Sequence, residues 1–160
     1  VMTTFPSPEP STIYVVVTSS DVTVSGFGTS FCGWHAYNSS MDMKYSFVGD
    51  PDKVQGCLAQ KTSPNYPGAD AMLSTLVHEL EETATDPQLT AWYSINGNEN
   101  SDKCAWTWGS TSTLGTSRGY YNLSLGGKNY LIQQGFALLS KKPGSNSIDT
   151  WSGQCSMPKA

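Results

Sequence analysis

The sequence predicts a single α+β domain, and three observations support this prediction. Residues 70–86 place apolar side chains at the 3, 4 and 7 spacing of a helix with one face in a core. Residues 12–19 and 43–49 are rich in β-branched and aromatic side chains, as strands are. The 160 residues contain no internal repeat and no linker between unlike halves, so we expect one core.

The N-terminal third is predicted to contain an extended arm and strands. Residues 1–11 hold three prolines and are expected to form the arm, with the domain running from 12 to 160. The stretch "TIYVVVTS" (12–19) has apolar residues on both faces, which predicts a central strand buried on both sides. "DVTVSGFG" (21–28) fits a short strand ending in a glycine turn. "MKYSFVG" (43–49) alternates apolar with polar residues and predicts a half-buried strand.

The helix is predicted from Asp70 to Asp86. Pro67-Gly68 breaks the chain before it, Asp70 can cap it, and Pro87 disfavours helical geometry at Asp86. Its apolar residues are expected to face the core: Leu73, Leu76, Val77, Leu80 and Ala84. Further on, residues 88–128 are rich in Gly, Asn, Ser and Trp, with a turn at Asn96-Gly97. Residues 130–140 form a last apolar element, either a strand or a short helix.

Composition indicates the setting in which the protein works. Charged residues make up only 14% of the chain against a usual value of about 25%. Ser, Thr, Gly and Asn are abundant instead, which is typical of secreted and wall-associated proteins. The net charge of −4 gives no electrostatic support for nucleic-acid binding. No apolar run approaches the length of a membrane span.

The cysteines also indicate an extracellular protein. Cys32, Cys57, Cys104 and Cys155 form no CxxC pair, so two disulfides are favoured over a thiolate zinc knuckle. Three pairings are possible, and we expect the sequential one, Cys32–Cys57 and Cys104–Cys155. Asn38 and Asn122 each begin an N-glycosylation sequon. The chain begins at Val1 without a secretory leader, so we expect a removed leader or a partial sequence.

The stretch "VHELEETATDP" (77–87) carries a candidate metal site. His78, Glu82 and Asp86 are spaced i, i+4 and i+8 and therefore lie on one side of the helix, away from the apolar line. An imidazole and a carboxylate one turn apart can bind the same Zn²⁺ ion. Glu79 occupies the position that takes a proton from water in HExxH metalloproteases. An ordinary solvated acidic helix face is the alternative.

The third ligand and the metal are left open by the residues. "NGNENSDKC" (96–104) offers Glu99 or Asp102 if this loop folds over the helix. His35, beside Trp34 and a predicted disulfide, is expected to be a packed structural residue and is held in reserve as a ligand. Zn²⁺ is the favoured ion, and the oxygen-rich set also suits Ca²⁺ or Mn²⁺.

Two other kinds of site are compatible with the residues. Glu79 or Glu82 with Glu99 or Asp102 offers a carboxylate pair for glycoside hydrolysis, although nothing fixes their separation. Aromatic residues of the loop region can form either a sugar-stacking platform or part of the core: Trp92, Tyr93, Trp106, Trp108, Tyr120 and Tyr121.

Long segments of the chain resemble the phosphate-induced protein 1 family, which includes the plant EXORDIUM proteins and relatives in oomycetes, fungi and bacteria. The likeness lies in "IYVVVTSSDVTVSGFGTSFCGWHAY", with its Cys-Gly-x-His motif, and in "MKYSFVGDP". "HELEETATDPQLTAWYSINGNENSDKCAW" is similar to the non-plant branch, and "YLIQQGFALL" with the late Cys155 matches the usual ending.

The resemblance implies a secreted, wall- or matrix-associated protein, and its non-plant branch implies a zincin-like helix. We therefore expect a single zincin-like domain with a mixed sheet. His78, Glu79 and Glu82 fall on the His-Glu-x-x-Glu motif of the non-plant branch, and Asp86 on its Thr-Asp-Pro. Glu99 and Asp102 fall on its Gly-x-Glu-x-x-Asp. Plant members usually carry a cysteine near Gly28, so the disulfide set here is expected to differ.

Three functions follow as expectations. The first is an extracellular metallohydrolase, most simply peptidase-like, with Glu79 as general base. The second is a non-catalytic matrix or filament protein in which the metal is structural and the arm at 1–11 docks on another copy or on a neighbouring protein. The third is a carbohydrate-binding module that uses the aromatic loop region.

Overall fold

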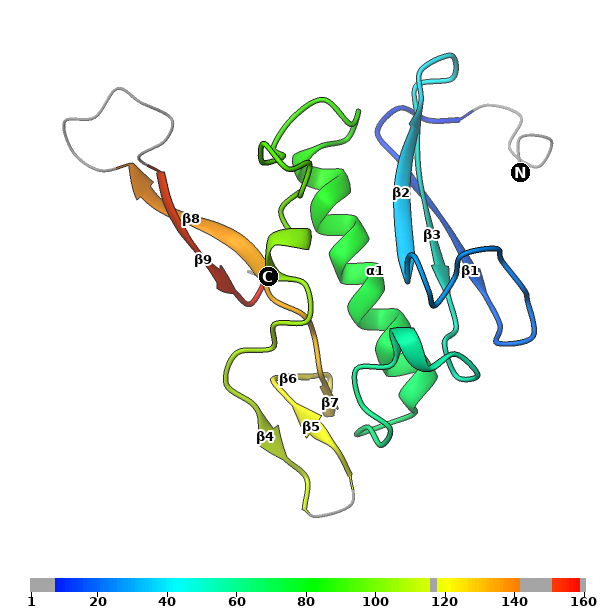
Figure 1. Ribbon diagram of the computed structural model, residues 1–160, viewed down its shortest axis with the longest axis vertical. Coiled ribbons are helices and arrows are strands. Elements are labelled where there is room, and N and C mark those ends of the chain that lie inside the picture. Colours follow the sequence, from blue (N-terminus) through cyan, green and yellow to red (C-terminus); the bar gives the residue numbers. More distant parts are fainter. Residues whose placement is uncertain (1–7, 116–117, 142–150, 159–160) are drawn as a thin grey trace.

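The computed structural model describes residues 8–115, 118–141 and 151–158 (Figure 1). The first seven residues of the predicted arm therefore lie outside the described residues. The strands are β1 (Ile13–Thr18), β2 (Gly33–Asn38), β3 (Met43–Gly49), β4 (Ser112–Thr113), β5 (Tyr120–Tyr121), β6 (Leu123–Leu125), β7 (Lys128–Tyr130), β8 (Gly135–Lys141) and β9 (Trp151–Ser156). The helices are α1 (Pro67–Thr85) and two 3-10 turns, η1 (Gln55–Cys57) and η2 (Asp102–Cys104).

These elements confirm an α+β fold with a mixed sheet, one main helix and two disulfides. The sheet has the order β1-β3-β2, with β1 parallel and β2 antiparallel to β3. The disulfides join Cys32 to Cys57 and Cys104 to Cys155, which is the sequential pairing. In Figure 1, α1 lies between this sheet and the strands of the C-terminal half. None of the helices in the described residues is long and apolar enough to cross a bilayer.

The predicted strand at 43–49 is confirmed residue for residue, but its place in the sheet differs. β3 is the central strand and is buried at most positions, so the expectation of a half-buried strand is wrong. The strand predicted at 12–19 forms as β1, yet it lies at the sheet edge, and Val17 is 58% exposed. Local apolar content thus predicted the strands but not which of them lies in the middle.

Residues 21–28 do not form the short strand that their pattern suggested. They form turns around Gly26 and Gly28, both with positive φ, and Phe27 makes only an isolated bridge to Phe31. Phe27 and Phe31 instead pack edge-on against Phe47 of β3. This aromatic cluster covers one face of the sheet.

Helix α1 covers the other face, and it begins earlier than predicted. Pro67 occupies the first turn, and Asp70 lies inside that turn, where its carboxylate accepts hydrogen bonds from the backbone and side-chain nitrogens of Asn65. The helix ends at Thr85, one residue before the predicted end at Asp86, and Asp86 is its C-cap. The side of the helix that includes Glu79 and Glu82 is buried, whereas Ala84 is exposed. The expectation that Ala84 faces the core is therefore wrong, and Leu73, Leu76, Val77 and Leu80 are only half-buried.

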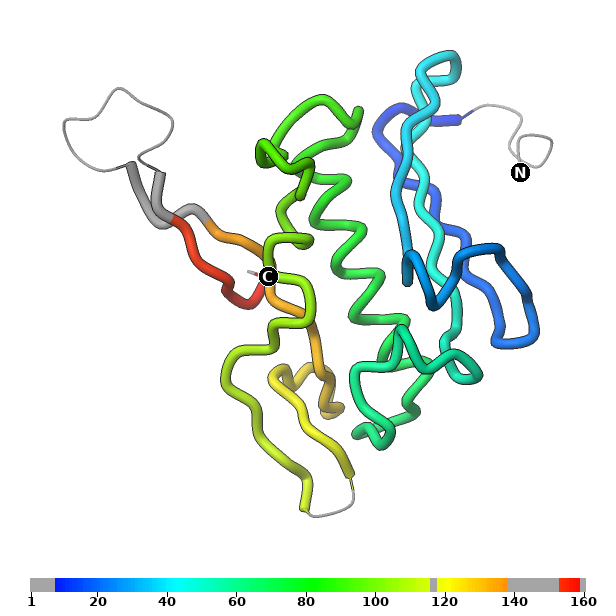
Figure 2. Tube along the Cα trace, in the orientation of Figure 1, coloured from blue at the N-terminus to red at the C-terminus, as the bar shows by residue number. Residues whose placement is uncertain are grey.

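The C-terminal half follows the other side of the helix as a chain of loops and short hairpins (Figure 2). The turn predicted at Asn96-Gly97 is confirmed, because the Ser94 amide donates to Asn98 O at 2.8 Å and Gly97 has positive φ. The apolar element at 130–140 is an extended segment, with Leu131 and Ile132 buried before β8. The Gln133 amide donates to Ser74 Oγ at 3.0 Å, which ties this segment to α1.

Ile132 allows a direct test of this core. Its side chain is 2% exposed, so Ile132→Ala should leave a cavity and lower the free energy of unfolding by about 2–5 kcal/mol. Ile95→Ala is the matched control, because Ile95 is fully exposed, and it should change stability by less than about 0.5 kcal/mol. Urea denaturation followed by tryptophan fluorescence measures both. Equal losses in the two variants would contradict this packing.

Candidate metal centre

The predicted helix residues and the predicted loop residues meet in space. His78 Nε2 lies 3.1 Å from Glu82 Oε1 and 3.4 Å from Asp102 Oδ1. Glu82 Oε1 also accepts the Asp102 amide at 3.0 Å, so η2 is bound directly to the last turn of α1. The loop at 96–104 therefore folds over the helix as the sequence suggested, and Asp102 joins His78 and Glu82.

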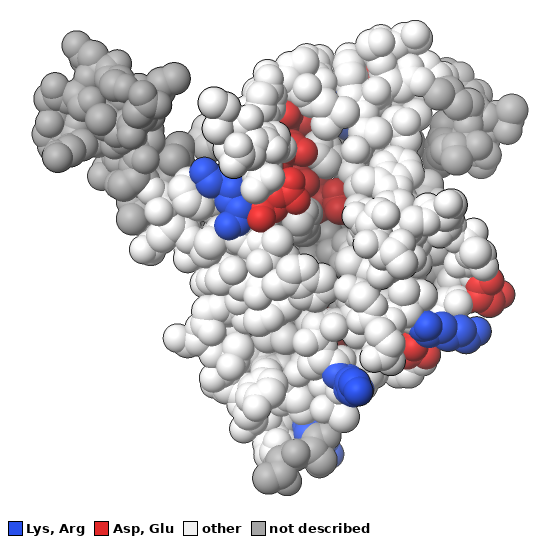
Figure 3. All heavy atoms as spheres, in the orientation of Figure 1, with Lys and Arg blue, Asp and Glu red and all other residues white. Residues whose placement is uncertain are grey.

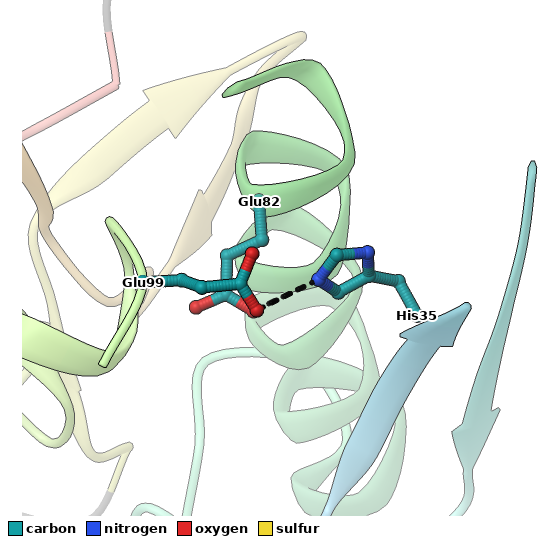
Figure 4. Close-up of side chains that lie close together, drawn as sticks. All are labelled: His35, Glu82 and Glu99. Atoms are coloured by element: carbon teal, nitrogen blue, oxygen red, sulfur yellow. Dashed lines mark hydrogen bonds and ion pairs between the residues drawn. The ribbon is translucent and has the colours of Figure 1, made fainter. Parts of the chain in front are cut away.

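Glu99 joins a different histidine. His35 Nε2 lies 3.0 Å from Glu99 Oε2 and 3.7 Å from Glu82 Oε2, and Figure 4 shows the three side chains pointing toward one another from β2, α1 and the loop. The side chains of His35 and Glu82 are 5% and 4% exposed. His35 is therefore packed, as expected, but its packing partners are two carboxylates.

Strand β2 explains why His35 faces the cluster. Alternate residues of a strand point to the same face, so Gly33 and His35 both face α1. A Cβ built on Gly33 would lie 2.7 Å from Glu79 Oε1 and 2.6 Å from Thr75 Cγ2. Gly33 thus provides the space in which Glu79 fits. In the sequence, only the short Cys-Gly-x-His motif indicates this part of the site. The residues of β2 were not predicted to form a strand.

Gln133 orients His78 and was not found from the sequence. Gln133 Nε2 lies 2.9 Å from His78 Nδ1 and donates to Ser101 O at 3.1 Å. A hydrogen bond at Nδ1 fixes the ring so that Nε2 faces Glu82 and Asp102. The position of this glutamine in an apolar C-terminal segment does not indicate a contact with the helix, so only the fold reveals it.

Asp86 belongs to neither group of donors. It is the C-cap of α1, with non-helical backbone angles, and its carboxylate accepts hydrogen bonds from the amides of Thr90 and Ala91. The i+8 spacing assumed a helix that continued to Asp86, and the helix ends one residue earlier. Its carboxylate stabilises the turn after the helix instead.

Asn38 and Asn122 occupy different surroundings. Asn38 is the last residue of β2, and its side chain accepts the Met41 amide. Asn122 Nδ2 donates to Trp108 O at 2.8 Å and to Ile132 O at 2.7 Å. A glycan on Asn122 would replace these hydrogen bonds, so Asn38 is the sequon we retain as a candidate.

Burial and charge set the protonation of the cluster. Glu79 is 4% exposed, and burial, together with the neighbouring carboxylates, raises its pKa to about 8. Burial alone would lower the pKa of His78, but hydrogen bonds to Asp102 and Glu82 outweigh it and raise this pKa to about 10. The pKa of Asp102 is lowered, first by its hydrogen bond to His78.

The donor set fits a divalent cation. Ligands about 2 Å from a tetrahedral Zn²⁺ ion lie about 3.3 Å from one another, close to the separations of His78 from Glu82 and Asp102. Each group of one histidine and two carboxylates keeps its donor atoms within 4.8 Å of one another. Glu99 Oε1 is buried without a hydrogen-bond partner, so this carboxylate has an oxygen that is free to accept a further contact.

A cavity opens beside His78 and Glu79. Its volume is about 370 Å³, and its lining includes both residues, Asp102, Trp106 and Trp108. Acidic side chains gather at a hollow near the centre of the face shown in Figure 3. The rings of Trp106 and Trp108 pack edge-on at 6.2 Å, and Trp106 is exposed, so an apolar wall borders the acidic one.

Comparison with known proteins identifies relatives. The family model described as "Phosphate-induced protein 1 conserved region" matches residues 1–134. The chain is 29% identical to Protein EXORDIUM-like 5 of Arabidopsis thaliana over 91% of its length and 50% of that protein. It is 27% identical to Protein EXORDIUM-like 3 of the same plant over 87% of its length and 51% of that protein. It thus spans about half the length of these curated relatives. No solved structure matches the chain.

The buried Glu79 predicts how stability depends on pH in the metal-free protein. Glu79 is protonated in both folded and unfolded chains below its ordinary pKa of 4.5, whereas between 4.5 and about 8 only the unfolded chain loses the proton. With chelator present, the free energy of unfolding should therefore fall as the pH rises through this window. Urea denaturation across the pH range measures this.

Glu79→Gln is the control for this slope, because it keeps the shape of the side chain and removes its titration. The variant should show a shallower fall in stability over the same pH range. An unchanged slope would contradict the buried position of the Glu79 carboxyl group.

Proposed function

This chain belongs to the phosphate-induced protein 1 family, and we propose that it is a secreted protein with a metal-dependent hydrolase site, most simply peptidase-like. The observation that supports this function is the convergence of His78, Glu82 and Asp102, with His78, Asp102 and the neighbouring Glu79 lining one cavity. We assign it to the non-plant branch of the family because that branch carries the His-Glu-x-x-Glu helix. The zincin-like character of the domain is part of the same proposal.

His78, Glu82 and Asp102 would hold the ion, and Zn²⁺ suits their mixture of nitrogen and oxygen donors. Ca²⁺ and Mn²⁺ remain alternatives for a set with two carboxylates. A bound divalent ion supplies Lewis-acid polarisation of a substrate carbonyl. Ligation through His78 Nε2 requires the proton on Nδ1. Gln133 presents its Nε2 to this atom and its Oε1 to the Trp106 amide, so ion binding would require the Gln133 amide to rotate and present its oxygen to the ring.

Glu79 is the general base of this proposal. Its carboxyl group is buried at the cavity and next to the metal ligands, so it can take a proton from the attacking water and deliver it to the leaving nitrogen. A buried carboxyl with a raised pKa is well matched to proton transfer near neutral pH. Gly33 keeps this position free of other side chains.

An extracellular setting agrees with the two disulfides, with the low share of charged residues and with the family. Because the chain covers about half of its plant relatives, the substrate and the partners of the whole protein are open. The N-terminal arm as a docking segment is part of the non-catalytic alternative, in which the same ion only holds the loop against the helix.

Chelation and Glu79→Gln distinguish the catalytic function from the structural one. Glu79→Gln should retain the metal and lower kcat/KM by about 10²–10⁴-fold on a quenched-fluorescence peptide library. Chelator should abolish turnover of the wild type. Asp21→Asn is the control, because Asp21 is fully exposed and lies outside the site. Full activity of Glu79→Gln would overturn the role of Glu79, and loss of stability on chelation without any turnover would favour the structural role.

Carbohydrate binding is the second candidate, because two tryptophans line the cavity. If sugars stack there, Trp106→Ala should raise the Kd for a bound glycan about tenfold, or about 1.4 kcal/mol. Trp92→Ala is the control, because Trp92 is as exposed as Trp106 but does not line the cavity. Glycan-array screening followed by calorimetry measures this effect, and equal behaviour of the two variants would contradict it.

A further inference from the structure

We propose that the site holds two divalent cations that share the Glu82 carboxylate. This inference rests on the proposed metal-dependent function and deepens it. One ion would lie with His78 and Asp102, and the second with His35 and Glu99. The second position uses the histidine that the sequence assigned to packing.

The two oxygens of Glu82 face different histidines. Oε1 is 3.1 Å from His78 Nε2, while Oε2 is 3.7 Å from His35 Nε2. Carboxylates that bridge two metals bind one ion through each oxygen, and the ions in two-metal hydrolases lie about 3.5–4 Å apart. Glu82 already has the orientation of a bridging ligand.

The second donor group is as compact as the first. The separations of His35 from Glu99 and Glu82, 3.0 and 3.7 Å, lie on either side of the edge of about 3.3 Å expected for a tetrahedral zinc site. His35 and His78 belong to different donor groups, each with its own second carboxylate. Two ions therefore satisfy the arrangement, whereas one ion leaves a histidine and a carboxylate unused.

The unused oxygen of Glu99 is an independent sign of a missing partner. Oε1 is buried without a hydrogen bond, while Oε2 contacts His35. A buried carboxylate oxygen without a partner is costly, and a cation bound by both oxygens would remove that cost. No lysine or arginine of the described residues forms an ion pair with Glu82, Glu99 or Asp102.

The charges of the ligands are compatible with two ions. Glu82, Glu99 and Asp102 together carry three negative charges when ionised, against four positive charges on two divalent cations with neutral histidines. Lys103 follows Asp102 in the chain, but its ammonium group lies over the Phe136 ring at 4.0 Å. Among the described residues, these acidic groups therefore have histidines but no lysine or arginine as ion-pair partners.

The second ion would give the site a specific capability. Two ions that share a carboxylate can hold both the attacking and the leaving oxygens of a substrate. Esters of phosphoric or carboxylic acids therefore join peptides as substrate classes for the site. A second ion would also link β2 to the loop at 99–102.

Metal stoichiometry tests the proposal without any substrate. The purified full chain is dialysed against Zn²⁺ and analysed by inductively coupled plasma mass spectrometry, and far-UV circular dichroism checks the fold. We expect two ions per chain in the wild type and one in His35→Asn and in His78→Asn. Glu81→Gln is the matched control, because Glu81 lies on α1 outside both donor groups, and it should retain two ions.

Electron paramagnetic resonance of the Mn²⁺-loaded wild type provides a second measurement that needs no variant. Two ions bridged by Glu82 should give an exchange-coupled spectrum, and either histidine substitution should convert it to that of an isolated ion. One uncoupled ion in the wild type overturns the proposal, whether His35→Asn retains that ion or loses it. No bound ion at all overturns the metal-dependent function as well, so the two failures are distinct.

Discussion

The structure depends on the buried carboxylate of Glu82. A carboxylate removed from water is destabilising unless charges or donors surround it, and the effective cost is several kcal/mol. Here two histidines from different parts of the chain and the Asp102 amide supply that surrounding. The sheet, the helix and the loop that follows it are thus held together by the polar cluster around Glu82. The apolar core is divided into two parts, one on each side of α1.

The buried polar cluster around Glu82 explains the small size of the apolar core. Met43, Phe47 and Val48 are buried on the sheet side of the helix, whereas Leu131 and Ile132 are buried on the other. Buried polar residues of α1 separate these groups: Asp70, Ser74, Glu79, Glu82 and Thr83. Each disulfide lies beside one group, since Cys32–Cys57 joins β2 to η1 and Cys104–Cys155 joins η2 to β9. Covalent links therefore support regions where hydrophobic burial is limited.

The sequence predicted the local features well and the environment of those features poorly. The bounds of β3 and the end of α1 depend on local propensity, and the disulfide pairing depends on the number of cysteines. The contact of Asp102 with His78 depends only on a loop that folds back over the helix. The burial of Glu79 and the edge position of β1 depend on which segment packs where. Gln133 and Gly33 act through neighbours 55 and 46 residues away in the chain, Gln133 on His78 and Gly33 on Glu79, and no periodicity reports such contacts.

The Cys-Gly-x-His motif now has a physical explanation for each fixed residue. Cys32 fastens the start of β2, Gly33 leaves room for the Glu79 carboxyl, and His35 reaches Glu99 and Glu82. Substitution of any of these three residues should therefore disturb the same cluster, each through a different contact. The motif is therefore part of the candidate site, although it lies more than 30 residues before the start of α1.

The long chain separation between His35 and Glu99 determines when this cluster can exist. The two residues are 64 positions apart, and closing a loop of that length costs entropy that local contacts do not repay. The cluster is therefore complete only when β2, α1 and η2 have docked. A nascent or partly unfolded chain offers an ion only the weak pair of His78 and Glu82 on the helix. Tight cation uptake would then mark completion of folding, and acid or chelator would act first on the last contacts to form.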